Sequence, residues 1–278
     1  MRSPFGLILV GSAALGAVFL ALPLVALFLR IPPGVLLEQL GSDVAREALV
    51  VSLKTSAIAH FLVLIVGTPV AYLLGTRAFR GRGLLIGLVE LPLVLPPAVA
   101  GIALLAAFGN RGLLGESLDV LGVSLPFTQA AVVVAIVFVS SPFYIRQAAA
   151  SFAAVDPLLL DASRTLGRGP GRTFLRVALP LAAGGLAAGS SLAFARGLGE
   201  FGATIIFAGS FAGVTRTAPL AIYAELDRDF DVAVALGALL VVFSIAVMAI
   251  VTLLLSWTRS SSRSPFPFAP SISDSTSA

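Results

Sequence analysis

Residues 146–180 read RQAAASFAAVDPLLLDASRTLGRGPGRTFLRVALP and separate two long apolar segments. Asp156 is a favourable N-cap, Pro157 suits the first helical position, and Gly167 suits the left-handed position beyond a helix C-terminus. These signals predict a short helix over 157–167. A second short helix is predicted to run from Pro170 to Leu179-Pro180, where the next apolar segment begins.

Both of these short helices need a surface on which to rest, because helices of this length are marginal in water. The first is rich in leucine, and the second places Arg168, Arg172 and Arg176 four residues apart on one face. The residues alone leave two surfaces open. One is a protein partner, and the other is the layer of lipid headgroups, which also suits a helix of arginine and leucine.

The composition is that of a membrane protein. Of the 278 residues, 58% are hydrophobic and 12% are charged, whereas soluble domains carry about 25% charged residues. The mean hydropathy is +1.04. The prediction is an all-α polytopic membrane protein whose six transmembrane helices cover roughly 5–29, 55–75, 84–108, 129–148, 180–208 and 232–257. The first apolar run is much longer than the roughly 7–15 residues typical of a signal peptide, which predicts a retained helix.

The basic residues predict the orientation. Eleven of the 18 lysines and arginines lie in the N-terminus, the 76–83 and 146–179 connections and the tail, whereas six lie in the opposite loops. The positive-inside rule therefore places both termini in the cytoplasm. The chain divides into an N-terminal helix with its outer loop (1–48), a core of five transmembrane helices (49–257) and a Ser/Pro-rich tail predicted to be disordered (258–278).

Several kinds of chemistry are excluded by simple counts. The chain has no Cys and one His, His60, so thiolate sites and multi-histidine metal clusters cannot form. Lys54 is the only lysine, and no glycine-rich phosphate loop precedes it. No basic stripe interleaved with aromatic residues suggests nucleic acid. We therefore expect a protein that is not an enzyme, holds no cofactor or metal of its own, and does not bind nucleic acid.

The stretch Asp161-Ala162-Ser163-x3-Gly167-x9-Val177-x-Leu179-Pro180 resembles the EAA loop of ABC importer permeases, E-A-A-x3-G-x9-I-x-L-P. The spacing matches throughout, with Asp, Ser and Val replacing Glu, Ala and Ile. The resemblance implies that 157–167 is a coupling helix that docks on a separate ATPase, which binds ATP and Mg²⁺. It assigns the docking contact to seven residues: Leu158, Asp161, Ala162, Ser163, Arg164, Leu166 and Gly167.

Other stretches resemble the molybdate branch of the same family, whose sulfate and tungstate permeases share much of the pattern. They are LPLVLPPAVAG (91–101), FGNRG (108–112), GEFGAT (199–204) and TRTAPLAIY (215–223). The resemblance implies a type I importer permease in a prokaryotic cytoplasmic membrane. Its implied partners are a second permease copy, two ATPase subunits, an extracytoplasmic oxyanion-binding protein and membrane lipid.

Candidate residues of the translocation path or gate lie in the third and fifth segments. Pro92, Pro96 and Pro97 are predicted to kink the third segment, because proline removes backbone donors. In the fifth, Arg196 and Glu200 are four residues apart and can pair, with Phe201 beside them. Intramembrane charges are usually paired or functional. The alternatives are a proline kink that serves packing alone and an ion pair that only fixes the helix.

Three further patterns are not assigned a role in transport. A small-residue stripe at Gly185, Gly189, Ala193 and Gly197 allows close helix packing, either within one subunit or across a dimer. Glu90 is expected either to extend toward the cytoplasmic interface or to pair with Arg80 or Arg82, and His60 to be a satisfied polar residue of the core.

Apart from Arg146, which is counted with the 146–179 connection, Arg196 is the only arginine or lysine within a predicted crossing, whereas an oxyanion site needs arginines or helix N-termini. We therefore expect no high-affinity anion site in this chain. The family resemblance implies that an external binding protein captures the anion and delivers it to a weak path.

Two other classes of protein are considered as rivals. The sequence argues against an intramembrane aspartyl protease, because Gly197-Leu198-Gly199-Glu200 has no second intramembrane aspartate with which to form a catalytic dyad. An intramembrane serine protease would need His60 beside Ser190 or Ser191. A secondary transporter normally shows several intramembrane acids and an inverted repeat, and only Glu90 and Glu200 are candidates here.

Overall fold

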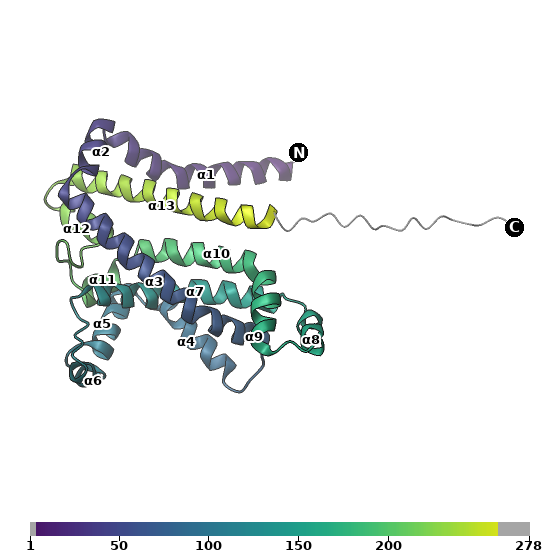
Figure 1. The fold of residues 1–278 in the computed structure, drawn as a ribbon. Coiled ribbons are helices and arrows are strands. Elements are labelled where there is room, and N and C mark those ends of the chain that lie inside the picture. Colours follow the sequence, from purple (N-terminus) through teal and green to yellow (C-terminus); the bar gives the residue numbers. More distant parts are fainter. Residues whose placement is uncertain (1–3, 261–278) are drawn as a thin grey trace.

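The structure is a computed structural model that describes residues 4–260, and this part of the chain consists of helices joined by loops, without strands. Figure 1 shows the long helices stacked side by side, with the short helices at the two ends of the bundle. The elements in order are α1 (Pro4–Arg30), α2 (Pro33–Leu40), α3 (Asp43–Thr76), α4 (Arg82–Val94), α5 (Pro97–Phe108), α6 (Gly115–Val120), α7 (Gln129–Ala153), α8 (Pro157–Thr165), α9 (Pro170–Thr173), the π-helical turn η1 (Phe174–Ala178), α10 (Leu179–Leu198), α11 (Gly202–Phe207), α12 (Ala218–Leu226) and α13 (Phe230–Ser260).

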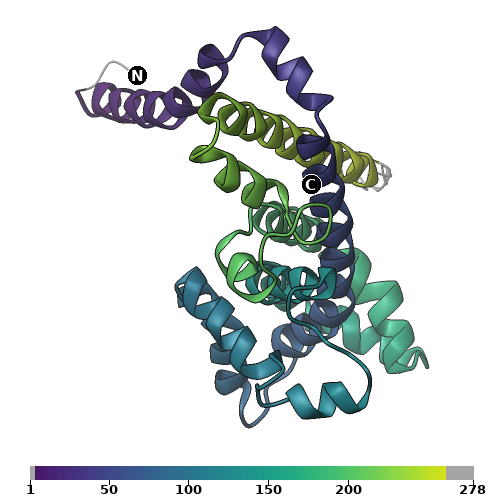
Figure 2. The ribbon, with the colours of Figure 1, turned by 90° about the vertical axis from the view of Figure 1, so that its left-hand side faces the viewer.

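Helix α7 is the centre of the packing and contacts both α3 and α10. Its buried face carries Tyr144 and Phe152, each 1% exposed, in a core shared with α3 and α10. A second core at the other end of α7 joins it to α5 and α11 around Phe207. Seen end-on in Figure 2, α1 and α2 lie at one side of the bundle and α5 and α6 at the opposite side.

The six predicted membrane crossings are found in the described chain when the third is counted as one crossing made of two helices. Five helical segments of the described chain are long and apolar enough to span a membrane: Phe5–Arg30, Asp43–Thr76, Gln129–Ala153, Pro170–Leu198 and Phe230–Val247. The predicted third crossing is a pair instead, α4 and α5, bent by 120°. Pro96 forms the N-cap of α5 and Pro97 its first turn, where the missing N–H costs no helical hydrogen bond. Pro92 is accommodated within α4.

The predicted fifth crossing is wrong at both of its ends. It does not begin at Leu179-Pro180, because α9, η1 and α10 form one continuous helical segment in which Pro180 lies in the first turn of α10. The π-helical turn η1 lies immediately before this proline, and such turns are insertions in an otherwise regular helix. The crossing also does not reach residue 208 as one helix, because α10 ends at Leu198 and α11 begins at Gly202.

Two other boundaries differ from the predictions. Helix α3 begins at Asp43 and not near residue 55, with Ser42 as an N-cap whose Oγ accepts a hydrogen bond from the Ala45 N–H at 3.2 Å. Helix α13 continues to Ser260, three residues into the predicted tail. The rest of that tail, 261–278, lies outside the described residues.

The small-residue stripe of α10 packs within the chain. A Cβ atom built on Gly189 would lie 2.9 Å from the Cβ of Gln147 on α7, and one built on Gly197 would lie 2.8 Å from Ile136, also on α7. A Cβ atom built on Gly185 would overlap Ser151, which also lies on α7. The ambiguity left by the sequence is thereby resolved in favour of close packing between α7 and α10 in one subunit.

Replacing Gly189 with leucine should therefore destabilise the protein. The new side chain overpacks the α7–α10 contact, and such changes cost about 1–3 kcal/mol. Ala188→Leu is the matched control, since Ala188 is exposed on the neighbouring position of α10. Thermal unfolding in detergent measures both variants. An equal midpoint for Gly189→Leu and Ala188→Leu would contradict the assigned packing.

Candidate coupling surface and translocation path

The predicted loop helix is present as α8, and its two ends are built as the sequence indicates. The Asp156 Oδ1 atom accepts a hydrogen bond from the Leu158 N–H at 2.9 Å. At the other end Gly167 has φ +79°, a left-handed conformation that glycine adopts without strain. The Gly167 N–H donates to the Arg164 carbonyl at 2.9 Å. These two residues fix where α8 starts and where the chain leaves it.

Helix α8 has a buried face and an apolar exposed face. Leu160 is 6% exposed and packs in the core around α7, and Ser163 is 5% exposed. The Ser163 and Thr173 hydroxyls lie 3.1 Å apart and are hydrogen-bonded. Leu158 and Leu166 are 73% and 80% exposed. The two leucines are therefore free to contact a partner, whereas Ser163 faces inward and ties α8 to α9.

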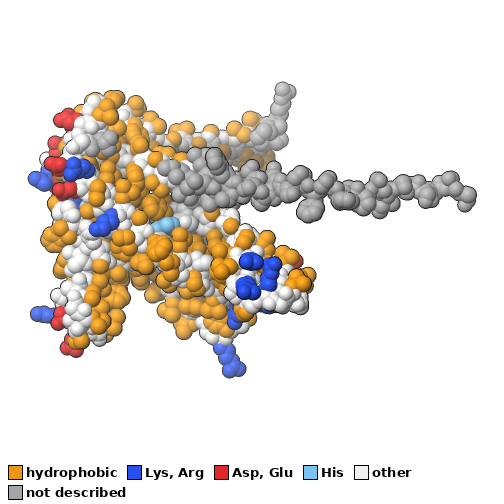
Figure 3. Space-filling view, in the orientation of Figure 1, with side chains coloured by type: hydrophobic (Ala, Val, Ile, Leu, Met, Phe, Trp, Pro, Cys, Tyr) orange, Lys and Arg blue, Asp and Glu red, His pale blue; other side chains and the backbone are white. Residues whose placement is uncertain are grey.

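The remaining residues assigned to docking lie on the exposed side of the loop. Asp161, Ala162, Arg164 and Gly167 are all exposed. The Arg164 Nη1 and Asp161 Oδ1 atoms lie 2.9 Å apart, an exposed ion pair of the kind that adds about 0–1 kcal/mol to stability. Figure 3 shows basic side chains gathered at this end of the molecule, whereas the opposite end carries both acidic and basic side chains.

The second candidate region is the break between α10 and α11. The Arg196 Nη2 and Glu200 Oε2 atoms lie 2.7 Å apart, and their side chains are 30% and 1% exposed. The Glu200 Oε1 atom accepts a hydrogen bond from the Ala203 N–H at 2.8 Å, at the start of α11. The predicted ion pair is thus present, but Glu200 lies beyond the end of α10 and also caps the next helix.

The broken α4–α5 segment meets this second break. A Cβ atom on Gly202 would overlap Pro97, so the first turn of α5 lies directly against the first turn of α11. The Phe201 ring lies 5.0 Å from the ring of Tyr223 on α12. The structure therefore brings the predicted path residues Pro97, Glu200 and Phe201 into one neighbourhood, formed by α5, α10, α11 and α12.

Some residues of this neighbourhood were not assigned from the sequence. Tyr223 lies within a quoted stretch, but its contact with Phe201 joins segments far apart in the chain. The Thr204 and Thr217 hydroxyls are buried and make no hydrogen bond within the described residues. A buried, unpartnered hydroxyl is uncommon, and only the packing around it reveals that it is buried.

The two candidate regions do not meet. In Figure 1 α8 lies at one end of the bundle, whereas α5, α11 and α12 lie toward the other. The helical segment from α9 to α10 runs from the α8 end to the second break. Helix α7 also spans the two ends of the bundle, packing with Leu160 of α8 at one end and with α5 and α11 at the other.

The predicted partner of Glu90 is wrong. The Glu90 Oε1 atom lies 3.2 Å from the Arg146 Nε atom on α7, because α4 lies along the C-terminal half of α7. Arg82 instead donates to the Leu74 carbonyl from Nε and Nη2, at 3.1 and 3.0 Å.

His60 makes a polar contact in the core, as predicted. Its Nε2 atom lies 2.8 Å from the Ser190 Oγ atom, and its ring meets Phe194 edge-on. In the described residues no acidic group is hydrogen-bonded to the other ring nitrogen. No cluster of three or more potential metal ligands occurs there either.

Comparisons with known proteins agree with this architecture. Residues 67–260 match the family described as "Binding-protein-dependent transport system inner membrane component". The molybdenum transport permease ModB of Mycobacterium tuberculosis is 46% identical over 85% of this chain and 89% of its own length. Its Escherichia coli counterpart is 40% identical over 80% and 96%. A sulfate transport permease, CysT of Synechococcus elongatus, is 33% identical over 86% and 87%.

Solved transporters show the same fold at low sequence identity. The chain superposes on a bacterial alginate ABC importer with a TM-score of 0.75, at 14% identity over 93% of this chain and 96% of that one. The methionine transporter MetNI gives a TM-score of 0.61, at 18% identity over 76% and 94%. The fold is that of a type I ABC importer permease, and the chain belongs to the family of binding-protein-dependent inner membrane transport components, as a multi-pass membrane permease.

Proposed function

We propose that this chain is the membrane-spanning subunit of an ATP-driven molybdate importer. The observation that carries the substrate is the 46% identity, over 85% of the chain, to a relative named as a molybdenum transport permease. Sulfate is the second candidate, supported by the 33% identity to the sulfate permease. The lower identity makes it the weaker of the two.

In this proposal the ATPase docks on α8. Leu158 and Leu166 insert into the partner, and burying a leucine contributes about 1.5–3 kcal/mol. Asp161, Ala162, Arg164 and Gly167 surround these anchors. ATP and Mg²⁺ are held by two ATPase subunits, and two copies of this chain enclose the path. The continuous segment from α9 to α10 carries movement of α8 to the second break, where the gate is proposed to lie.

The path itself is proposed to be weak in anion affinity. Arg196 has its charge balanced by Glu200 at 2.7 Å, so it offers little free positive charge to an oxyanion. High affinity is then supplied by an external binding protein, which delivers the anion near Pro96, Pro97 and Phe201. Both termini face the cytoplasm in this arrangement, which agrees with the arginines near α8.

The test is ATP hydrolysis by the complex reconstituted with its binding protein, titrated with molybdate, tungstate and sulfate. We expect half-maximal stimulation by molybdate at a concentration at least about tenfold below that for sulfate, a difference of about 1.4 kcal/mol. Stimulation by sulfate alone moves the substrate to the second candidate. An assembled complex that none of the three anions stimulates overturns the oxyanion proposal.

A further inference from the structure

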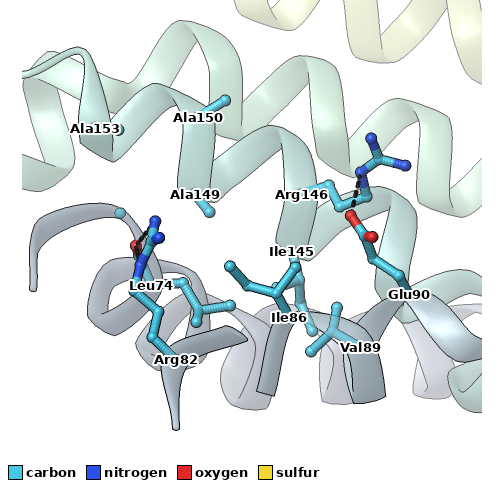
Figure 4. A pocket seen from close by; sticks show the side chains of 11 residues that line it. Leu74, Arg82, Ile86, Val89, Glu90, Ile145, Arg146, Ala149, Ala150 and Ala153 are labelled. Atoms are coloured by element: carbon cyan, nitrogen blue, oxygen red, sulfur yellow. Dashed lines mark hydrogen bonds and ion pairs between the residues drawn. The ribbon is translucent and has the colours of Figure 1, made fainter. Parts of the chain in front are cut away.

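An apolar groove lies between α4 and α7, at the α8 end of the membrane domain. Its volume is about 210 Å³. Figure 4 shows Leu74, Ile86 and Ile145 along its length, with Arg82 at one end and the Glu90–Arg146 ion pair at the other. Eight residues separate Arg82 from Glu90 on α4, so the groove runs for about 12 Å along the helix axis.

The groove is open because several of the side chains that line it are short. Beyond Ile145 and Arg146, the α7 side is made of Ala149, Ala150 and Ala153, whose side chains are single methyl groups. None of the residues of α4 is buried. This helix therefore packs on the rest of the chain through a few partly buried apolar side chains and the ion pair between Glu90 and Arg146. The neighbouring surface of α4 is apolar, with Leu84 71% and Leu88 58% exposed. In a membrane protein such a surface is covered either by lipid chains or by another apolar protein surface.

The mouth of the groove, at Arg82, follows a basic loop in the chain. Arg77 and Arg80 are exposed in the loop before α4, and Arg82 is exposed at its first position. Two of the five guanidinium N–H groups of Arg82 are used by the Leu74 carbonyl. This contact fixes the side chain at the mouth and leaves the other donors for an acceptor. A rigid guanidinium with free donors suits a phosphate group.

The acidic residues near this end are already engaged within the described chain. Glu90 pairs with Arg146, Asp161 pairs with Arg164, and the Asp156 carboxylate caps α8. A second copy of the chain therefore has no spare described carboxylate at this end to match the three arginines. Charge complementarity favours an anionic lipid over a second copy.

We propose that this groove binds an anionic phospholipid, with its phosphate at Arg82 and one acyl chain between α4 and α7. Basic pockets between transmembrane helices on the cytoplasmic side are suited to such headgroups. The bound chain fills the space that the three alanines leave and braces α4. Because α4 is one half of the broken α4–α5 pair, the lipid stabilises the arrangement of that pair.

The test measures lipid retention by the purified transporter complex. The complex is incubated with phosphatidylglycerol or phosphatidylcholine, and retained lipid and the thermal midpoint are recorded by native mass spectrometry and by unfolding. We expect phosphatidylglycerol to be retained and to raise the midpoint, and phosphatidylcholine to do neither. Arg82→Gln should weaken phosphatidylglycerol binding about tenfold, the effect of losing one charged hydrogen-bond donor. Ala149→Leu, which fills the groove, should abolish retention.

Two control variants carry the same substitutions elsewhere. Arg111→Gln changes an exposed arginine at the opposite end of the membrane domain, and Ala130→Leu changes an exposed alanine on α7 away from the groove. Both should retain the lipid as the parent chain does. Equal retention of the two lipids overturns the proposal. So does protection by inorganic phosphate alone, which indicates a small-anion site. Loss of the permease dimer in Ala149→Leu with unchanged lipid retention indicates that a second copy fills the groove.

Discussion

Gly167→Pro should abolish assembly with the ATPase while leaving the chain inserted in the membrane. Proline requires φ near −65°, whereas Gly167 has φ +79°. Proline also lacks the N–H that donates to the Arg164 carbonyl at 2.9 Å. The chain must therefore leave α8 in another direction, which displaces Leu166 from the docking face. We expect the affinity for the ATPase to fall at least about a hundredfold, equivalent to about 2.8 kcal/mol.

Gly169→Pro is the matched control for this experiment. Gly169 has φ −66° and ψ 163° as the N-cap of α9, a conformation that proline adopts, and a Cβ atom there meets nothing within 4 Å. Co-purification of the ATPase measures assembly, and the amount of chain in washed membranes measures insertion. Normal assembly of Gly167→Pro would remove α8 from the docking surface. Loss of assembly in both variants would point to a general effect of proline in this loop.

Glu200→Ala should have the second largest effect, because it removes two contacts at once. The buried carboxylate pairs with Arg196 at 2.7 Å and accepts the hydrogen bond of the Ala203 N–H at 2.8 Å. Removing one member of a buried ion pair costs about 3–5 kcal/mol, since the other charge is left without a partner. We expect the free energy of unfolding to fall by about that amount and anion-stimulated ATP hydrolysis to be lost.

A double variant separates the charge from the cap. Arg196→Gln with Glu200→Gln removes both charges but keeps an oxygen that can accept from Ala203, so it should be more stable than Glu200→Ala. Asp161→Ala is the control, because its pair with Arg164 is exposed and should change stability by less than about 1 kcal/mol. Thermal unfolding measures all three. If the double variant is less stable than Glu200→Ala, the Glu200 side chain does not act as assigned.

The α8 loop shows what local sequence can predict. Asp156 and Gly167 act on the backbone within a few residues, so the start and end of α8 follow from residue type alone. The same holds for Pro96 and Pro97, whose missing donors predict a break in the third segment. At that break the helices are bent by 120° and Pro97 lies against Gly202, more than a hundred residues away in the chain, a contact that no local pattern encodes.

The membrane-spanning helices, the coupling-loop motif and the Arg196–Glu200 pair could be predicted from the residues alone, because hydropathy, capping and i,i+4 spacing are properties of neighbouring residues. The pairing of Glu90 with Arg146, the packing of the α10 small-residue stripe on α7 and the groove between α4 and α7 follow from the packing of the helices. These features are contacts between distant segments. They depend on how the helices pack against one another, because local sequence allows several contact partners for the same side chain.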